Sequence, residues 1–415
     1  MHSNKSVAKN VMWNTVGSLF YLGIQWLITI FVKIISGEFG PVGVLSLAMS
    51  LSATFQTISN FGIRNFQVSD VEGKYSDSTY VGLRNVTCLL SIVLCFVFSL
   101  IMRYEAEQLW SIVLFMIFRI AESYSDVLHG IAQKADRLDI AGKSFCIKGL
   151  AILIGFFLPY YLSRSLCLSL LFMAIVAWLT TIFFDLLMTR RLSSFNLYDK
   201  ASNCLKLAKE TLPLFVYLFL FSTLTTIPKI FIEKMTLDEA ALGAYSSIFS
   251  IATLFQMATG YVYTPFIHIF ATHYHQKDMK RFFSSLAKVV AVMLALALIA
   301  IVGATFLGEF ALSLVFGDDI RPYSFLLNPI LLSVFILSLL GFLFMIEVVI
   351  RDFRGLIIGN FVGFVLCTIL TPILINSKEI NGANLALIIS GLASSAIVAI
   401  SMLLKIRQNI RSQNE

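Results

Sequence analysis

The chain has 415 residues, of which 58% are hydrophobic and only 13% charged, and its mean hydropathy is +0.85. This balance lies far outside that of soluble globular proteins and indicates an integral membrane protein. The formal net charge is +7, but the basic residues gather in loops on one side of the predicted helices. We therefore interpret the charge as a signal of membrane topology and exclude nucleic acid as a partner.

Apolar runs long enough to cross a bilayer, about 20 residues each, recur along the whole chain. The first run is too long for a signal-peptide core and no small-residue cleavage site follows it, so we predict a retained helix. Six runs lie in each half, so both halves enter the membrane from the same side. The predicted spans are 12–33, 42–62, 82–102, 109–128, 146–163, 166–188, 211–232, 242–264, 286–308, 325–349, 355–375 and 385–404.

The loops between these runs differ in basic charge, and Lys and Arg concentrate in cytoplasmic loops. One set of loops holds 23 basic residues, among them Arg64, Arg84 and Lys148, whereas the opposite set holds six. The richer set includes both ends of the chain. The sequence therefore predicts that both termini are cytoplasmic.

The connector between the sixth and seventh runs is the only substantial one on the predicted cytoplasmic side. Its Arg190-Arg191 pair and its Lys206-x-x-Lys209 spacing predict an amphipathic helix on the inner leaflet, and a partner-docking element is the alternative. We predict an N-terminal six-helix bundle over 1–189, a linker over 190–210, a C-terminal six-helix bundle over 211–404 and a cytoplasmic tail over 405–415.

An internal repeat relates the two halves. When the chain is compared with itself at an offset of 200 residues, Phe55-Gln56 aligns with Phe255-Gln256 without a gap, together with several neighbouring positions. Chance coincidence in hydrophobic helices is the alternative, but the shared register and the matched pairs favour duplication. Tandem membrane bundles that bind substrate at the interface of two repeats are typical of transporters.

Short motifs accompany the helices along the chain. They are Lys5-x-x-x-Lys9-Asn10-x-x-Trp13-Asn14-x-x-Gly17 at the start, Gly40-Pro41-x-Gly43 before the second helix, Leu212-Pro213-Leu214 opening the seventh, Leu242-Gly243-Ala244-Tyr245-Ser246 opening the eighth and Val315-Phe316-Gly317 after the ninth. In this order and spacing they resemble the polysaccharide-exporter branch of the multidrug/oligosaccharidyl-lipid/polysaccharide (MOP) superfamily. The resemblance spans nearly the whole chain.

The resemblance implies an all-α integral membrane protein with twelve transmembrane helices in two six-helix bundles, the V-shaped fold of MATE-like transporters. It also implies a Wzx-type flippase of the bacterial inner (cytoplasmic) membrane. Such a flippase moves an undecaprenyl-diphosphate-linked oligosaccharide, for example an O-antigen repeat unit, to the periplasmic leaflet by alternating access. The implied partners are the lipid-linked glycan, membrane lipids and polysaccharide polymerase or chain-length machinery, and no cofactor is implied.

Ionisable side chains at bilayer depth are costly, so those inside predicted spans are candidate functional residues. Arg119 lies near the middle of the fourth span, and Glu122 follows on the same helical face. A guanidinium group binds phosphate oxygens bidentately, so we predict that Arg119 binds the substrate and that Glu122 holds it in place. The alternative is a structural pair that neutralises itself between helices.

Four further charged residues are candidates with weaker support. Lys229 follows a proline in the seventh span and Lys33 lies at the outer end of the first, so both are predicted substrate-binding cations, with snorkelling to the interface as the alternative. Asp185 and Glu347 are candidate ion-coupling residues. The alternative for Glu347 is an interfacial ion pair with Arg351, one turn further on.

Amide and aromatic side chains within the spans are also candidates. Amides in spanning segments usually face other helices or a wet cavity, so the repeat-matched Gln56 and Gln256 are predicted to line the cavity symmetrically. Tyr21 and other aromatic residues could stack on sugar rings, although anchoring at the interface explains most of them. The remaining amides of this kind are Asn14, Gln25, Asn60 and Asn360.

An enzymatic function has little support in the sequence. There is no phosphate-cradling glycine motif, and no large outer loop of the kind that carries catalytic residues in polysaccharide polymerases and lipid-linked glycosyltransferases. His273 and His275 are two residues apart and do not share a helical face, so we predict no metal site. We therefore predict that the protein is not an enzyme.

A cation-coupled multidrug antiporter of the same superfamily is the main alternative function. It would share the fold, and Glu122 and Asp185 could serve a cationic drug. The first span contains no acidic residue, however, and Arg119, Lys33 and Lys229 favour an anionic ligand.

Overall fold

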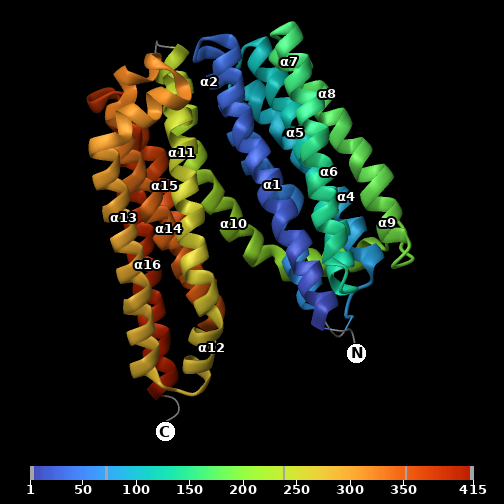
Figure 1. Cartoon of the computed structure of the whole chain (residues 1–415). Helices are drawn as coiled ribbons and strands as arrows, with labels where there is room; N and C mark the ends of the chain where they lie inside the picture. Colours follow the sequence, from blue (N-terminus) through green and yellow to red (C-terminus); the bar gives the residue numbers. More distant parts are fainter. Residues whose placement is uncertain (1–3, 71–72, 237–238, 351–352, 412–415) are drawn as a thin grey trace. The chain divides into compact units, whose positions relative to one another are not determined.

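The computed structural model describes residues 4–411 except 71–72, 237–238 and 351–352. Within these ranges the chain consists of helices and connecting turns and contains no strand (Figure 1). It divides into two compact units, Met1–Ser222 and Thr223–Glu415. The predicted all-α, multi-pass membrane architecture is confirmed.

The first unit holds the helices that build the candidate site. They are α1 (Asn4–Ser36), α2 (Gly40–Asn60), α3 (Ile63–Ser69), α4 (Asp77–Ile101), α5 (Ala106–Lys134), α6 (Leu138–Ile152), α7 (Leu158–Ser163), α8 (Leu166–Thr180) and α9 (Leu187–Arg190). Two π-helical segments, η1 (Leu153–Phe157) and η2 (Thr181–Leu186), join α6 to α7 and α8 to α9. Each of these joined pairs therefore continues as one membrane span.

The second unit begins inside a long helix, α10, whose residues Ser222 and Thr223 mark the boundary. The helices from this point are α10 (Ala201–Met235), α11 (Glu239–Tyr263), α12 (Ile267–His275), α13 (Met279–Phe316), α14 (Leu327–Ile350), α15 (Phe353–Lys378) and α16 (Ile380–Arg411). Two short 3-10 segments, η3 (Thr264–Phe266) and η4 (Asp318–Leu326), precede α12 and α14.

The connector over 190–210 differs from the predicted separate amphipathic helix. Residues 191–200 form turns and irregular chain, and Ala201 begins α10, which continues without a break through the predicted seventh span. The non-helical part is tied to α4: the Ser193 hydroxyl donates to Asp77 Oδ2 (2.6 Å) and the Thr79 hydroxyl donates to Asp199 Oδ2 (2.5 Å). These hydrogen bonds hold the connector against the first unit.

Each predicted span falls in a helical segment, but the expected number of twelve apolar spans is not reached. Within the described ranges, eleven helical segments are long and apolar enough to cross a membrane, and α5 is not among them. The physical reason is its charge, since Arg119, Glu122 and Asp126 all lie on this 29-residue helix. Because α5 contacts α2, α4, α6 and α8, it is surrounded by other helices of the first unit.

Glycine allows α1 and α6 to pack closely, and the two helices run side by side in the first unit (Figure 1). A Cβ atom added to Gly17 would lie 2.1 Å from the carbonyl oxygen of Gly142 on α6. Close backbone approach of this kind is the usual packing mode of membrane helices, because apolar side chains gain little by leaving lipid. The α1–α6 contact therefore depends on the absence of a side chain at Gly17.

We expect Gly17→Ala to destabilise the protein by about 1–3 kcal/mol or more, because the added methyl group overpacks a backbone contact that cannot give way. Gly23→Ala is the matched control on the same helix, since a Cβ there would meet no atom within 4 Å. Thermal unfolding of both variants in detergent measures the difference. Equal melting temperatures for the two variants would show that the α1–α6 contact does not limit stability.

Candidate functional site

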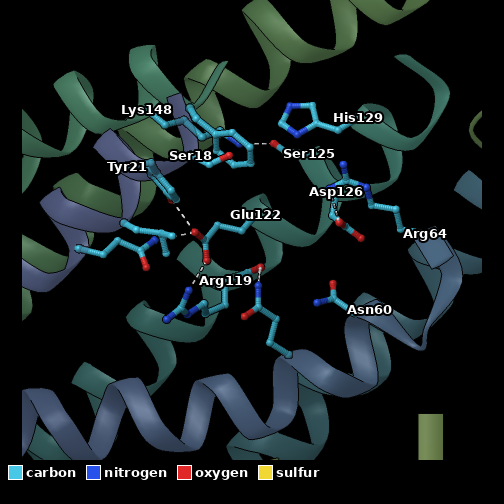
Figure 2. Close-up of a pocket in the computed structure, with 14 residues that line it drawn as sticks. Ser18, Tyr21, Asn60, Arg64, Arg119, Glu122, Ser125, Asp126, His129 and Lys148 are labelled. Carbon is cyan, nitrogen blue, oxygen red and sulfur yellow. Dashed lines mark hydrogen bonds and ion pairs between the residues drawn. The ribbon is translucent and has the colours of Figure 1, made fainter. Parts of the chain in front are cut away.

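A cavity of about 340 Å³, lined mostly by polar and charged residues, lies within the first unit (Figure 2). One face of α5 supplies Arg119, Glu122, Ser125, Asp126 and His129, which recur at spacings of three and four residues and therefore form one stripe. The rest of the lining comes from α1, α2, α3 and α6. These residues are Ser18, Tyr21, Leu22, Gln25, Gln56, Asn60, Arg64, Phe145 and Lys148.

The carboxylate of Glu122 is held by three donors. Its Oε2 pairs with Arg119 Nη1 at 2.5 Å, while its Oε1 accepts hydrogen bonds from the Tyr21 hydroxyl at 2.5 Å and from Gln25 Nε2 at 2.8 Å (Figure 2). Both oxygens are thus engaged by groups from α1 and α5. The arrangement fixes the orientation of Glu122 and, through it, one edge of the Arg119 guanidinium group.

Arg119 retains hydrogen-bonding capacity toward the cavity. Its carbon Cζ lies 5.2 Å and 5.7 Å from the ring centroids of Phe115 and Phe118, an arrangement that stabilises the cation. Its buried Nε has no hydrogen-bond partner among the described residues. Since a guanidinium group carries five N–H donors and Glu122 takes one contact, Arg119 can donate to an anion in the cavity.

A second ionic cluster centres on Asp126. Its Oδ2 pairs with Arg84 Nη2 at 2.9 Å and its Oδ1 with Arg64 Nη1 at 3.1 Å. The Arg84 side chain is fully buried, and its Nη1 also donates to the Ser59 carbonyl (2.6 Å) and to Asn60 Oδ1 (2.9 Å). The cluster joins α2, α3, α4 and α5 behind one wall of the cavity.

A third cluster surrounds Asp185, in the π-helical segment η2. Its Oδ2 accepts from the Ser125 hydroxyl at 2.6 Å and lies 3.2 Å from Lys148 Nζ, and its Oδ1 lies 3.1 Å from His129 Nε2. Asp185, His129 and Lys148 are all buried. The three partners line the cavity, so Asp185 anchors cavity residues from α5 and α6.

The structure brings together three of the predicted substrate-binding residues, Arg119, Glu122 and Gln56. Gln56 Nε2 donates to the Arg119 carbonyl at 3.4 Å. Lys33 lies outside this cavity lining: it is buried, donates to the Gly37 carbonyl at 2.8 Å and lies 4.2 Å from the ring centre of Phe39. It therefore interacts with the turn that follows α1.

The other predicted residues lie in the second unit. Lys229 on α10 is half-buried and lies 5.2 Å from the ring centre of Phe249. Gln256 on α11 is half-buried, and its backbone carbonyl accepts from the Thr259 hydroxyl at 2.7 Å. Glu347 on α14 is fully buried. Its expected partner Arg351 lies outside the described residues.

Three residues of these clusters were assigned wrongly from the sequence. Arg64, Arg84 and Lys148 were predicted in cytoplasmic loops, but all three lie in helices, and only Arg64 is not buried. Arg84 and Lys148 lie near the starts of the predicted spans 82–102 and 146–163 but were counted with the loops, and Arg64 lies two residues beyond the span 42–62. Their inclusion among the loop cations weakens the count of 23 on which the predicted orientation rests.

Asp126 escaped the sequence-based prediction although it lies within the predicted fourth span. The signal that identifies it is the polar stripe Arg119, Glu122, Asp126 and His129, with spacings of three, four and three. Such a stripe on an otherwise apolar helix indicates a face that packs against polar partners.

We expect Asp185→Ala to destabilise the protein by about 3–5 kcal/mol, because it leaves the buried Lys148 ammonium group without its counter-ion. The double variant Asp185→Leu/Lys148→Met should be less destabilised than Asp185→Ala, since it removes both charges. Equilibrium unfolding in mixed micelles measures these differences. Additive losses from Asp185→Leu and Lys148→Met, each also made alone, would show that the two side chains do not interact.

Comparisons with known proteins agree on the fold. The chain is similar to a lipid II flippase, MurJ, in an inward closed conformation, with a TM-score of 0.73 and 12% identity over 95% of this chain and 89% of that chain. It is also similar to an inward-facing multidrug resistance MATE family transporter of the MOP superfamily, with a TM-score of 0.67 and 11% identity over 94% of this chain and 98% of that one. The chain therefore shares the fold of these two proteins.

Sequence comparison defines the family. Residues 7–264 match the family described as polysaccharide biosynthesis protein. The capsular polysaccharide biosynthesis protein CapF of Staphylococcus aureus is 26% identical over 310 residues, which cover 73% of this chain and 76% of CapF. The chain belongs to the polysaccharide biosynthesis protein family, and the predicted resemblance to the polysaccharide-exporter branch is confirmed.

Proposed function

We propose that the protein is a flippase that moves an undecaprenyl-diphosphate-linked oligosaccharide across the bacterial cytoplasmic membrane by alternating access. Three findings support this function: membership of the polysaccharide biosynthesis family, similarity to a capsular polysaccharide biosynthesis protein, and a fold shared with a lipid II flippase. The family and the fold together favour transport over catalysis.

The cavity of the first unit carries the proposal, because its chemistry suits an anionic head group. Three basic residues line it, Arg64, Arg119 and Lys148, against two acidic ones, Glu122 and Asp126. The planar guanidinium group of Arg119, which donates only from Nη1 to Glu122 among the described residues, offers further donors in the geometry that phosphate oxygens accept bidentately. A positive cavity with a positioned guanidinium group favours a diphosphate over a cationic drug.

The size of the cavity restricts which part of the substrate enters it. At about 340 Å³, it lies near the lower end of the range of small-molecule pockets. The diphosphate fits this range, while the polyprenyl tail stays in lipid, where it needs no polar partner. Glu122 keeps Arg119 in place until the diphosphate competes for it.

The membrane potential assists transport in the outward direction. At about 2.3 kcal/mol per charge per 100 mV, two phosphate charges that leave a negative interior gain about 4–5 kcal/mol. This gain requires that the charges cross without accompanying cations. A flippase of this kind therefore needs no nucleotide hydrolysis.

We expect Arg119→Ala to lower glycan export about 10- to 100-fold, the loss that corresponds to one charged hydrogen-bonding contact. Arg119→Lys should restore only part of the activity, because an ammonium group cannot bind bidentately. Export is measured as surface glycan in a bacterium that lacks its own oligosaccharide flippase but makes a matching glycan. Accumulation of the undecaprenyl-linked precursor is the second readout.

Arg191→Ala serves as the matched control, since Arg191 is exposed and lies outside the cavity lining. Membrane levels of each variant are compared by immunoblot. Full glycan export by Arg119→Ala would show that Arg119 does not bind the diphosphate. Resistance to cationic dyes without any glycan export would favour the multidrug antiporter, for which Glu122 and Asp126 would be the cation-binding groups.

A further inference from the structure

We propose that Arg64 is a second phosphate-binding residue at the junction of two cavities, and that the smaller cavity beside it binds a sugar attached to that phosphate. This inference rests on the proposed function, because it assumes an anionic glycan-bearing ligand. It assigns the phosphate of the head group to Arg64 and the sugar to the lining of the smaller cavity.

The second cavity, of about 240 Å³, lies where α3 meets the C-terminal part of α5. Its lining residues are Arg64, Asn65, Val68, Ser69 and Gln133. Arg64 belongs to the linings of both cavities. A group bound at Arg64 therefore has one side toward the Arg119 cavity and the other toward the amides of the smaller one.

The turn between α2 and α3 places Arg64 at this junction. Phe61 and Gly62 both have left-handed backbone angles, with φ of 47° and 67°, so the chain changes direction before Ile63 begins α3. The Phe61 ring stacks on Phe215 with centroids 4.3 Å apart, and a Cβ added to Gly62 would lie 2.9 Å from Leu214 Cδ2. Both contacts pack the turn firmly against α10.

The charges around Asp126 leave Arg64 with positive charge to offer. Asp126 carries one negative charge but contacts two guanidinium groups, from Arg84 and Arg64. Arg84 is fully buried and needs a counter-ion, because an uncompensated buried charge is strongly destabilising. Asp126 therefore neutralises Arg84, and the cluster as a whole carries one excess positive charge.

That excess charge lies on the accessible member of the cluster. The Arg64 side chain is 27% exposed, whereas the Arg84 side chain is fully covered. Arg64 donates from Nη1 to Asp126 at 3.1 Å and from Nη2 to Gln133 Oε1 at 3.2 Å. Its five N–H groups exceed these two contacts, so it can also donate to phosphate oxygens. Figure 2 shows Arg64 beside Asp126, with Asn60 nearby.

The other residues of the smaller cavity suit a neutral polar ligand. Gln133 uses its carbonyl oxygen to accept from Arg64, so its amide nitrogen remains a donor. The Ser69 hydroxyl donates to the Phe66 carbonyl at 3.0 Å, which leaves its oxygen as an acceptor. Asn65 adds an amide and Val68 an apolar surface. Donors, acceptors and a small apolar patch together match a sugar ring.

Binding to the purified full-length chain in nanodiscs tests the assignment with two probes. One is farnesyl diphosphate, and the other is the same molecule with one N-acetylglucosamine on the diphosphate. We expect Arg64→Ala to weaken binding of both probes about tenfold or more, as for the loss of a charged hydrogen bond. Gln133→Ala should weaken only the sugar-bearing probe, about threefold to tenfold.

Arg191→Ala is the control for loss of an exposed arginine, and thermal unfolding of each variant checks folding. If Arg64→Ala does not fold, Arg64→Gln removes the charge but keeps a polar side chain with one amide donor group.

Unchanged binding of both probes by the folded Arg64 variant, together with loss of binding in Arg119→Ala, would overturn this inference and leave the proposed function standing. Equal effects of Gln133→Ala on both probes would refute the sugar assignment. Failure of the unaltered protein to bind either probe would contradict both proposals.

Discussion

The structure of the first unit depends on the cost of placing charge where water is scarce. An ionised group in such surroundings needs a partner of opposite charge and further hydrogen bonds. The helix α5 carries a stripe of such groups, and their partners come from neighbouring helices: Tyr21 and Gln25 from α1, Arg84 from α4 and Asp185 from η2. The contacts of α5 with these elements therefore satisfy its charges and also enclose the cavity.

The three ionic clusters differ in the positive charge that they leave available. In the Asp185 cluster, the carboxylate is buried and contacts Lys148, His129 and Ser125, so the cluster stabilises the wall of the cavity. In the Glu122 cluster, the carboxylate is held by three donors while Arg119 keeps an unpartnered Nε. The Asp126 cluster has two guanidinium groups for one carboxylate. The groups best able to recognise an anion are therefore Arg119 and Arg64.

The two units share a helical pattern but not its chemistry. Gln56 and Gln256 occupy matched sequence positions, yet of these two only the Gln56 side chain donates a hydrogen bond to an arginine among the described residues, at the Arg119 carbonyl. In α14, the tenth predicted span, Glu347 is the single charged residue, whereas α5, the fourth, carries several. In the second unit, small residues give close packing: Gly355, Gly359 and Gly363 on α15 face Ser401, Val398 and Ser394 on α16.

The sequence by itself determined the class of protein, the positions of nearly all helices and the leading residue pair, Arg119 and Glu122. Those inferences depend on hydrophobic run length and on i, i+3 spacing, which are local properties of one helix. It misplaced Arg64, Arg84 and Lys148, and it predicted a separate linker helix where α10 begins. Only the tertiary structure decided which carboxylate faces which cation between helices. The ion pairs of Asp126 with Arg64 and Arg84 join residues 62 and 42 positions apart, and the pair of Lys148 with Asp185 joins residues 37 positions apart. A charged residue interrupts an apolar run in the sequence, so it can be assigned to a membrane span only when its partner of opposite charge on another helix is known.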